Sequence, residues 1–283
     1  MLAAEPTPGF PQNQNWSIQM PSIDRNGVPI YFEDVGSGPP VVMGHSILCS
    51  GEMWVNQVPR LAERYRVINI DQRGHGRSVP ATSPYELCDM VEDAFAVIDH
   101  LEIDRAIWAG LSMGGMVAMH AAIAAPDRVA ALLLLDTHAG AEMPYKKLKY
   151  RAMSIGAKAF GVRPFFPAVI PLLFGRTTLA ENQALIADWK PRFEEIHVQS
   201  LARAVSALTR RPSIVRELSE VECPSLVIVG EEDASLPPHL SREIADALPN
   251  ASLVVIPQAG HLSALEKPEE VTEAMLGFLG TVS

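Results

Sequence analysis

The residues from Ala106 to Val129, AIWAGLSMGGMVAMHAAIAAPDRV, run from apolar β-forming residues through a glycine-rich corner into an alanine-rich helical pattern. Ser112 stands at the corner, with Gly110 two residues before it and Gly114 two residues after it. This spacing fits G-x-S-x-G between a strand and a helix. So tight a turn strains the serine backbone and requires small neighbours. The stretch predicts a serine hydroxyl held at the carboxyl edge of a sheet, where a helix N-terminus favours negative charge. The alternative is a glycine-rich turn that only packs the helix against the sheet.

Short apolar segments alternate with helical patterns on both sides of this corner. The segments expected as strands are 27–36, 39–46, 64–74, 106–112, 129–136, 224–233 and 251–261. The segments expected as helices in between are 85–103, 114–126, 237–248 and 267–280. Continuous apolar strands that alternate with helices predict an α/β fold with a mostly parallel central sheet covered on both faces.

The alternation stops between His138 and Ser219, where the sequence is helical in pattern and richer in basic and aromatic residues. We interpret 138–219 as a helical cap, or lid, inserted into a core domain made of 17–137 and 220–283. Residues 1–16, with several prolines and glutamines, are expected to form an N-terminal arm. The basic run KKLKYR at 146–151 is expected to be a solvated helix face, with an anion-binding patch as the alternative.

Composition limits the partners and the compartment. The chain has 283 residues, is 48% hydrophobic and carries a formal net charge of −10. Such an acidic balance argues against a nucleic-acid partner or an anionic membrane surface. The longest apolar run, 129–135, is too short to span a bilayer, and the N-terminus does not have the pattern of a secretory signal. Cys49, Cys88 and Cys223 are an odd, widely spaced set without metal-ligand spacing, which suits a reducing compartment and predicts a cytoplasmic protein with no metal site.

A serine hydroxyl becomes a good nucleophile only when a base takes its proton. His261 is the best candidate because it comes just after the last expected strand and so reaches the same sheet edge as Ser112. His45 and His75 stand in turn-like contexts and are expected to brace loops.

The base in turn needs a carboxylate that orients it and stabilises its charged form. Asp233 follows the penultimate strand, and the order Ser112, Asp233, His261 is the nucleophile, acid, base order of this kind of sheet. Asp136, at the end of the strand before, is the rival acid.

An oxyanion requires preorganised donors, and the amide of Met113 directly follows the nucleophile. The second donor is expected to be the amide of Ile47, with Ser46 as the fallback. Phe165, Phe166 and Leu172 of the cap are expected either to form the roof of the pocket or to be cap core. The complete set of expected substrate contacts is Ser46, Trp54, Phe165, Phe166, Leu172 and Leu262.

Five blocks of sequence together carry a resemblance to a known superfamily. They are GHSILCSGEMW (44–54), DQRGHGRS (71–78), GLSMGG (110–115), GEEDASLPP (230–238) and AGHLSALEKPEEV (259–271). With them the chain resembles the α/β-hydrolase superfamily over nearly its whole length, and within it the 3-oxoadipate enol-lactonase group and related small carboxylesterases. The resemblance implies an α/β-hydrolase fold. It also implies that Ser112 is the nucleophile, Asp233 the acid and His261 the base, with oxyanion amides at Ile47 and Met113.

The function expected from these residues is that of a cofactor-free serine hydrolase. Its substrate is expected to be a small, rather apolar carboxylic ester or lactone, and the protein is expected to be a monomer or a homodimer. A carbon–carbon bond hydrolase or a cofactor-free perhydrolase could use the same three side chains. A ligand-binding or receptor-like protein with slow turnover is a further alternative, of a different class.

Overall fold

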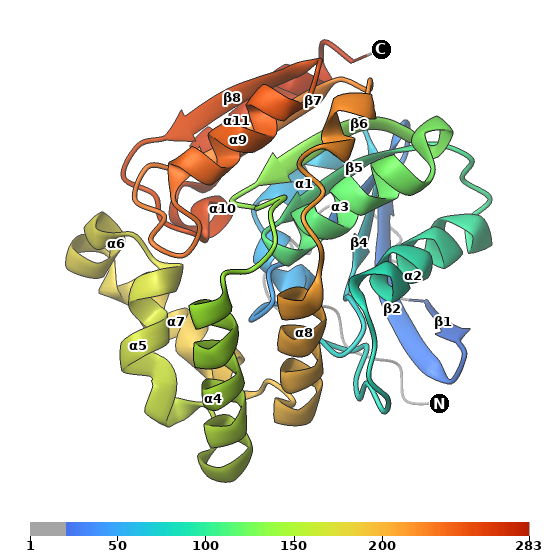
Figure 1. The fold of residues 1–283 in the computed structure, drawn as a ribbon. Coiled ribbons are helices and arrows are strands. Elements are labelled where there is room, and N and C mark those ends of the chain that lie inside the picture. Colours follow the sequence, from blue (N-terminus) through green and yellow to red (C-terminus); the bar gives the residue numbers. More distant parts are fainter. Residues whose placement is uncertain (1–20, 283) are drawn as a thin grey trace.

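A twisted eight-stranded sheet lies between helices in the computed structural model, which describes residues 21–282 (Figure 1). The strand order is β1-β2-β4-β3-β5-β6-β7-β8. The pairs β1·β2 and β2·β4 are antiparallel, and every other neighbouring pair is parallel. The predicted α/β fold with a mostly parallel sheet is therefore confirmed. The predicted arm, residues 1–16, lies outside the described residues.

The bounds of the elements are as follows. The strands are β1 Ser22–Arg25, β2 Val28–Gly36, β3 Pro40–Gly44, β4 Arg66–Ile70, β5 Ala106–Leu111, β6 Val129–Leu135, β7 Ser225–Gly230 and β8 Ala251–Ile256. The helices of the core are α1 Gln57–Leu61, α2 Leu87–His100, α3 Met113–Ala124, α9 Pro238–Ala247, α10 Ser263–Glu266 and α11 Pro268–Leu279. The remaining helices are α4 Pro144–Phe160, α5 Phe166–Leu173, α6 Arg176–Glu181, α7 Gln183–Glu194 and α8 Val198–Arg210. Short 3₁₀ helices lie at Gly51–Trp54, Pro126–Arg128, Arg163–Phe165 and Glu217–Glu220.

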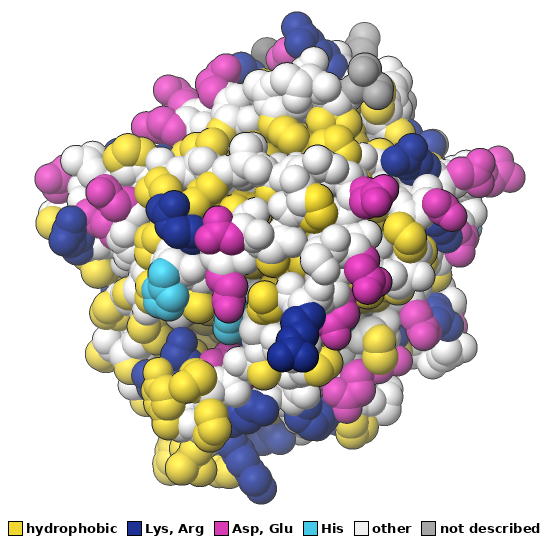
Figure 2. Space-filling view, turned by 45° about the horizontal axis from the view of Figure 1, so that its top comes forward, with side chains coloured by type: hydrophobic (Ala, Val, Ile, Leu, Met, Phe, Trp, Pro, Cys, Tyr) yellow, Lys and Arg dark blue, Asp and Glu magenta, His cyan; other side chains and the backbone are white. Residues whose placement is uncertain are grey.

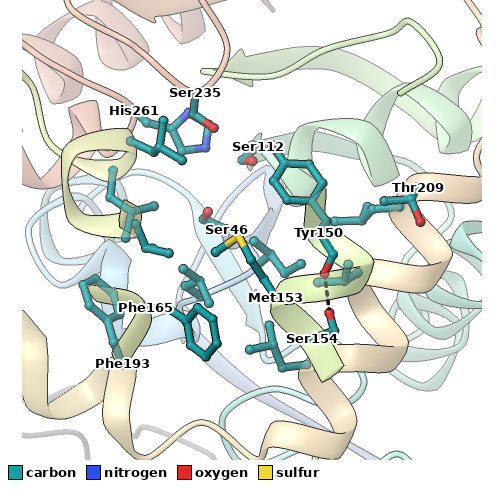
Figure 3. A pocket seen from close by; sticks show the side chains of 18 of the residues that line it. Ser46, Ser112, Tyr150, Met153, Ser154, Phe165, Phe193, Thr209, Ser235 and His261 are labelled. Carbon is teal, nitrogen blue, oxygen red and sulfur yellow. Dashed lines mark hydrogen bonds between the residues drawn. The ribbon is translucent and has the colours of Figure 1, made fainter. Parts of the chain in front are cut away.

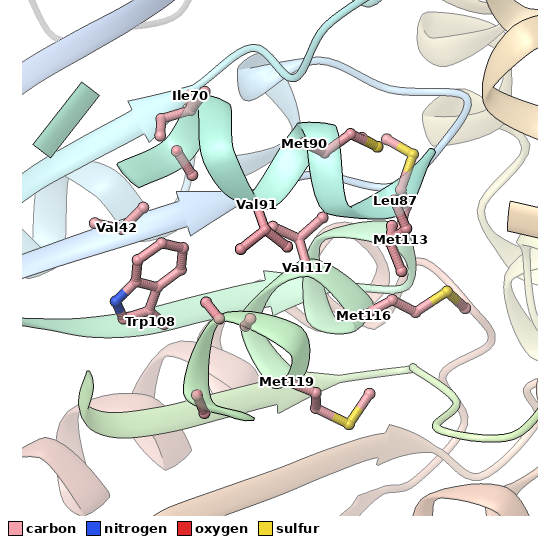
Figure 4. Close-up of a cluster of buried hydrophobic side chains, with 14 of the residues drawn as sticks. Val42, Ile70, Leu87, Met90, Val91, Trp108, Met113, Met116, Val117 and Met119 are labelled. Atoms are coloured by element: carbon pink, nitrogen blue, oxygen red, sulfur yellow. The ribbon is translucent and has the colours of Figure 1, made fainter. Parts of the chain in front are cut away.

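The central strands are apolar on both faces because both faces are covered. Every residue of β5 is buried, and alternate residues enter different cores: Trp108 packs on one side of the sheet and Leu111 on the other. Figure 4 shows the first core, in which Trp108 of β5 lies on the same side of the sheet as Val91 of α2 and Val117 of α3. Each large apolar side chain buried in this way contributes about 1.5–3 kcal/mol. These strands therefore hold the carboxyl ends of the sheet rigidly in place.

Helices α4–α8 follow β6 and precede β7 in the chain, and they form a layer beyond one end of the sheet (Figure 1). The two segments that join this layer to the core lie together, because the amide of Ile214 donates to the carbonyl of Ala139 at 2.9 Å. Nothing in residues 138–219 forms a strand, and this agrees with the helical pattern of the sequence. We refer to α4–α8 below as the cap helices.

The structure differs from the predicted elements mainly at their ends. The expected strand 251–261 stops at Ile256, and residues 257–261 form the turn that carries His261. Strand β1 was not predicted because its four residues, SIDR, are too short to show a pattern. It pairs with the start of β2 at the edge of the sheet and does not alter the site.

Candidate active site

Ser112 occupies the sharp turn between β5 and α3. Its backbone has φ 55° and ψ −109°, a combination that a residue with a side chain rarely adopts. The turn is held from both sides: the Ser112 amide donates to the carbonyl of Leu135 at 2.9 Å, and Thr137 Oγ1 donates to the Ser112 carbonyl at 2.7 Å. The hydroxyl is thereby fixed above the carboxyl edge of the sheet, as the sequence predicted.

The glycines around Ser112 make room for backbone rather than for the serine side chain. A Cβ on Gly110 would lie 2.2 Å from the carbonyl carbon of Gly114. A Cβ on Gly114 would lie 2.2 Å from the carbonyl oxygen of Gly44, at the end of β3. The Gly114 amide also donates to the carbonyl of His45 at 3.1 Å. The close approach of α3 to the end of β3 therefore requires glycine.

The substitution Gly114→Ala should destabilise the fold severely because the backbone oxygen of Gly44 cannot move away cheaply. We expect a loss of about 3 kcal/mol or more, seen as a fall of roughly 6–12 °C in the thermal midpoint. Gly277→Ala is the matched control: Gly277 lies within α11, and apart from its neighbours and the backbone of its own helix no atom lies within 4 Å of the added Cβ. That change should be neutral or stabilise by up to about 1 kcal/mol. Equal midpoints for the two variants would contradict the steric argument.

His261 and Asp233 come from separate turns that meet beside the ends of β7 and β8. His261 Nδ1 lies 2.8 Å from Asp233 Oδ2, and both side chains are buried. The other carboxylate oxygen of Asp233 accepts the amides of Ser235 and Leu236, each at 2.8 Å. Burial alone lowers the pKa of His261, but the charge and the hydrogen bond of Asp233 outweigh it, and the pKa lies above its ordinary value of 6.5. The arrangement leaves Nε2 of His261 free to serve as a base.

The rival acid, Asp136, is held by different partners. Its Oδ1 accepts the amide of Gly230 at 2.8 Å, and its Oδ2 accepts the hydroxyl of Ser263. Burial, together with the nearby charge of Asp233, raises the pKa of Asp136 well above its ordinary value. A buried carboxyl group with both oxygens hydrogen-bonded suits a role in packing the His261 turn against β7. The geometry favours Asp233 as the partner of His261.

The turn after β3 is built around His45. Its Nε2 accepts the amide of Gln72 at 2.9 Å, and its Nδ1 lies 2.8 Å from the carbonyl of Ser46. Burial, with the nearby His75, lowers the pKa of His45 to about 3, so the ring is neutral at ordinary pH. These contacts confirm the bracing role predicted for His45.

One hydrogen bond separates the two candidates for the second oxyanion donor. Both residues, Ser46 and Ile47, line the cavity described below. The amide of Ser46 is already engaged, because it donates to Met53 Sδ at 3.3 Å. Met113 is the first residue of α3, and the first amides of a helix have no acceptor within the helix. The amides of Ile47 and Met113 therefore stay the expected pair of oxyanion donors. The buried hydroxyl of Ser46, without a hydrogen-bond partner among the described residues, borders the same cavity.

A cavity of about 210 Å³ lies between the sheet edge and the cap helices and reaches both Ser112 and His261. Figure 3 shows these two side chains facing a space that Ser46, Tyr150, Met153 and Phe165 also border. The cap side chains that line it are mainly apolar: Tyr150, Met153, Ala157, Val162, Phe165, Phe166, Val169, Leu172, Leu173, Phe193, Leu201, Val205 and Leu208. The polar ones are Glu142, Ser154, Thr209 and Arg211. The site can hold a small, largely apolar molecule next to the serine hydroxyl.

The expected substrate contacts divide into two groups. Ser46, Phe165, Phe166 and Leu172 line the cavity. Trp54 and Leu262 do not: each is fully buried in the second core, and the Leu262 amide donates to the carbonyl of Leu173. Their expected contact with substrate is corrected to a packing role, because position next to a site residue in sequence does not fix the direction of a side chain.

The sequence interpretation missed the part of α4 that lines the cavity. Tyr150, Met153 and Ala157 are spaced by three and four residues, so they lie on one face of the helix. That spacing could have been seen in the sequence, but only the structure tells which face of α4 turns toward Ser112.

Glu266 was also missed. Its carboxylate accepts the amide of Gly260 at 2.9 Å and that of Gly175 at 2.8 Å, so it joins the His261 turn to the cap.

Within residues 21–282 no group of three or more His, Cys, Asp and Glu side chains is arranged to hold a metal ion. No helix in the described part of the chain is both long and apolar enough to cross a bilayer.

Comparison with known proteins gives a consistent picture. Residues 41–274 match the model of the alpha/beta hydrolase family. The protein named "Putative non-heme bromoperoxidase BpoC" of Mycobacterium tuberculosis is 33% identical over 261 residues, which cover 90% of this chain and 99% of that protein. A thermophilic esterase from Thermogutta terrifontis has a TM-score of 0.87 at 31% identity and covers 95% of this chain and 99% of its own. The enol-lactonase from Burkholderia xenovorans has a TM-score of 0.86 at 27% identity, over 92% of this chain and all of that one.

Proposed function

The chain belongs to the alpha/beta hydrolase family, and from this premise we propose that it hydrolyses a small, largely apolar carboxylic ester or lactone through an acyl-enzyme intermediate. One observation carries the proposal. His261 Nδ1 lies 2.8 Å from Asp233 Oδ2, and His261 borders the same apolar cavity as Ser112. The esterase and the enol-lactonase among the structural neighbours support the choice of ester or lactone.

In the proposed reaction, Ser112 Oγ attacks the substrate carbonyl carbon while His261 Nε2 takes the hydroxyl proton. Asp233 keeps the imidazole oriented and stabilises its positive charge. The amides of Ile47 and Met113 hold the oxyanion that forms. The imidazolium returns the proton to the leaving alcohol oxygen, and His261 then activates a water that releases the acid and frees Ser112.

Screening the purified protein against lactones, aryl esters and alkyl esters tests the substrate class. A cavity of about 210 Å³ with mainly apolar cap residues should prefer short, uncharged acyl groups over long or charged ones. Labelling of Ser112 by a fluorophosphonate tests the covalent step independently of the substrate. Turnover of no ester or lactone, with no labelling of Ser112, would overturn the proposal and favour a ligand-binding protein.

Perhydrolysis is a second candidate, favoured by the name of the Mycobacterium tuberculosis relative. If hydrogen peroxide replaces water, its oxygen attacks the acyl-enzyme, the product is a peracid, and the serine is freed as before. The peracid can then oxidise bromide and return to the acid. Formation of peracetic acid from acetate ester and peroxide, lost in Ser112→Ala, would identify this activity.

The cytoplasmic location, the division into core and cap domains and the monomeric or dimeric state stay predictions.

The activity should fall as the pH is lowered because His261 can accept the serine proton only when its ring is neutral. The charge and hydrogen bond of Asp233 raise its pKa above 6.5 despite burial, so the midpoint of the fall in kcat/KM should lie above pH 6.5. Removing the carboxylate charge with Asp233→Asn should shift any residual activity toward a lower midpoint. A profile that stays flat well below about pH 6 would contradict the role of His261 as base.

A further inference from the structure

Exposed apolar side chains gather on the outer face of α4. Among the described residues, the large hydrophobic side chains that are exposed are Met143, Tyr145, Leu148, Ile155, Phe160 and Val255. All but Val255 belong to α4 or the residue before it. Leu148 is 72% exposed, Ile155 62% and Phe160 76%. A monomeric protein rarely leaves several large apolar side chains together on one helix without a use for them.

The same helix has the opposite charge to the rest of the chain. α4 contains five Lys and Arg residues and no Asp or Glu, although the whole chain has a net charge of −10. Figure 2 shows yellow and dark blue side chains together at the lower edge of the molecule, where the cap helices lie in Figure 1, whereas most of the acidic side chains lie elsewhere on this face. The net charge of the chain therefore does not describe this surface.

The two faces of α4 are separated by the helical repeat. Tyr150, Met153 and Ala157 face the cavity. At about 100° per residue, Leu148 and Ile155 point away from it and form a ridge. Arg151 lies along one side of this ridge and Lys149 along the other, and both are exposed. An apolar ridge between basic flanks is the arrangement by which a helix lies in the interface of an anionic bilayer.

We propose that the outer face of α4 docks the protein on an anionic lipid bilayer. We define this face by its apolar ridge, Tyr145, Leu148 and Ile155, and its basic flanks. A second copy of the chain fits the face less well, because pairing two α4 helices would bring like charges together without an acidic residue on either helix. An anionic bilayer satisfies both features at once: its headgroups attract Lys and Arg, and its acyl chains accept the ridge.

Docking through α4 would bring the candidate active site close to lipid because the inner face of the same helix lines the cavity. Apolar esters dissolved in the bilayer would then reach Ser112 by a short path. This consequence rests on the proposed hydrolase function, whereas the docking does not. Binding of Ser112→Ala to vesicles separates the two, since that variant should bind lipid normally even if the wild-type protein hydrolyses nothing.

Sedimentation of the full chain with vesicles tests the proposal. We expect binding to phosphatidylcholine vesicles that contain phosphatidylglycerol, and weak binding to vesicles of phosphatidylcholine alone. The double variant Leu148→Ser with Ile155→Ser should bind the anionic vesicles at least roughly tenfold more weakly than the wild type does. Val255→Ser, which removes an exposed apolar side chain from β8, is the matched control and should bind as the wild type does.

The basic flanks are tested separately with Lys149→Gln and Arg151→Gln. Each should weaken binding to the anionic vesicles by roughly fivefold, and added salt should reduce binding of the wild type. Arg242→Gln, an exposed position on α9, is the matched control and should have no effect. Circular dichroism checks that every variant is folded.

Three results would overturn the proposal. The first is equal binding of the wild type and the ridge variant. The second is equal binding to neutral and anionic vesicles, because the basic flanks would then have no role. The third is a dimer in solution that the ridge variant converts to monomer while the wild type fails to bind vesicles, because the face would then be an interface between two copies.

Discussion

Ser112→Ala is expected to reduce kcat for a short-chain p-nitrophenyl ester by about 10⁴-fold or more, leaving only the residual rate that the oxyanion donors and substrate binding support. The residue sits at φ 55°, a strained position that the sheet and Thr137 hold in place, and its hydroxyl borders the cavity. Alanine removes the attacking atom and leaves the turn intact, so the fold should be unchanged. Initial rates, with circular dichroism as a check on folding, measure the effect.

The matched control for this prediction is Ser154→Ala. Ser154 also lines the cavity, but its hydroxyl donates to the carbonyl of Tyr150 within α4. Its loss should change kcat by no more than a few fold. A fluorophosphonate should label the wild type and Ser154→Ala, but not Ser112→Ala. Substantial turnover by Ser112→Ala would show that another group is the nucleophile and would overturn the acyl-enzyme mechanism.

The second large effect is expected for Asp233→Asn, with Asp136→Asn as its matched control. The two carboxyl groups are both buried near His261, but only Asp233 bonds the imidazole. In Asp233→Asn, the amide oxygen can still accept the amides of Ser235 and Leu236, so the amide nitrogen turns toward His261 Nδ1. The imidazole must then carry its proton on Nε2, the atom that has to accept the proton of Ser112. We expect kcat to fall by about 10⁴-fold.

Asp136→Asn should be far milder. An asparagine at this position can accept the amide of Gly230 through its oxygen and bond Ser263 through its nitrogen, so both hydrogen bonds of the native side chain have replacements. Burial and the nearby charge of Asp233 also raise the pKa of Asp136, which disfavours its charged form. The kcat values of Asp136→Asn and Asp233→Asn, measured side by side, decide which of the two aspartates is the acid that orients His261. If Asp136→Asn abolishes activity and Asp233→Asn does not, the assignment of the acid is wrong.

Local patterns were enough to predict the fold and the order of the candidate catalytic residues. Continuous apolar strands between helices predicted the parallel sheet, because only a sheet covered on both faces buries every strand residue. Ser112, Asp233 and His261 each stand at the carboxyl end of an expected strand, and the carboxyl ends of parallel strands meet at one edge. A strained turn such as the one at Ser112 is specified by the residues within it and beside it.

Other features depended on which side chains distant segments bring together. The sequence could not tell that Gly114 faces the backbone of Gly44, or that Asp136 is engaged by Gly230 and Ser263. Nor could it place Trp54 and Leu262 in the core. Each of these facts is a contact between residues far apart in the chain, and no local period encodes such a contact.

The cap helices show most clearly which features the sequence predicts and which only the tertiary structure decides. Its helices were expected from the sequence, because the pattern of residues 144–160 is helical whatever surrounds it. The direction of α4 was not, because both of its faces carry apolar residues: Tyr150 and Met153 on one, Leu148 and Ile155 on the other. Only packing against the core decides which face lines the cavity and which is left to solvent. The sequence by itself therefore determined that Ser112, Asp233 and His261 stand at one edge of the sheet, where local turns and strand order suffice. The tertiary structure decided the shape of the pocket and of the outer surface, because both depend on how the cap packs against the sheet.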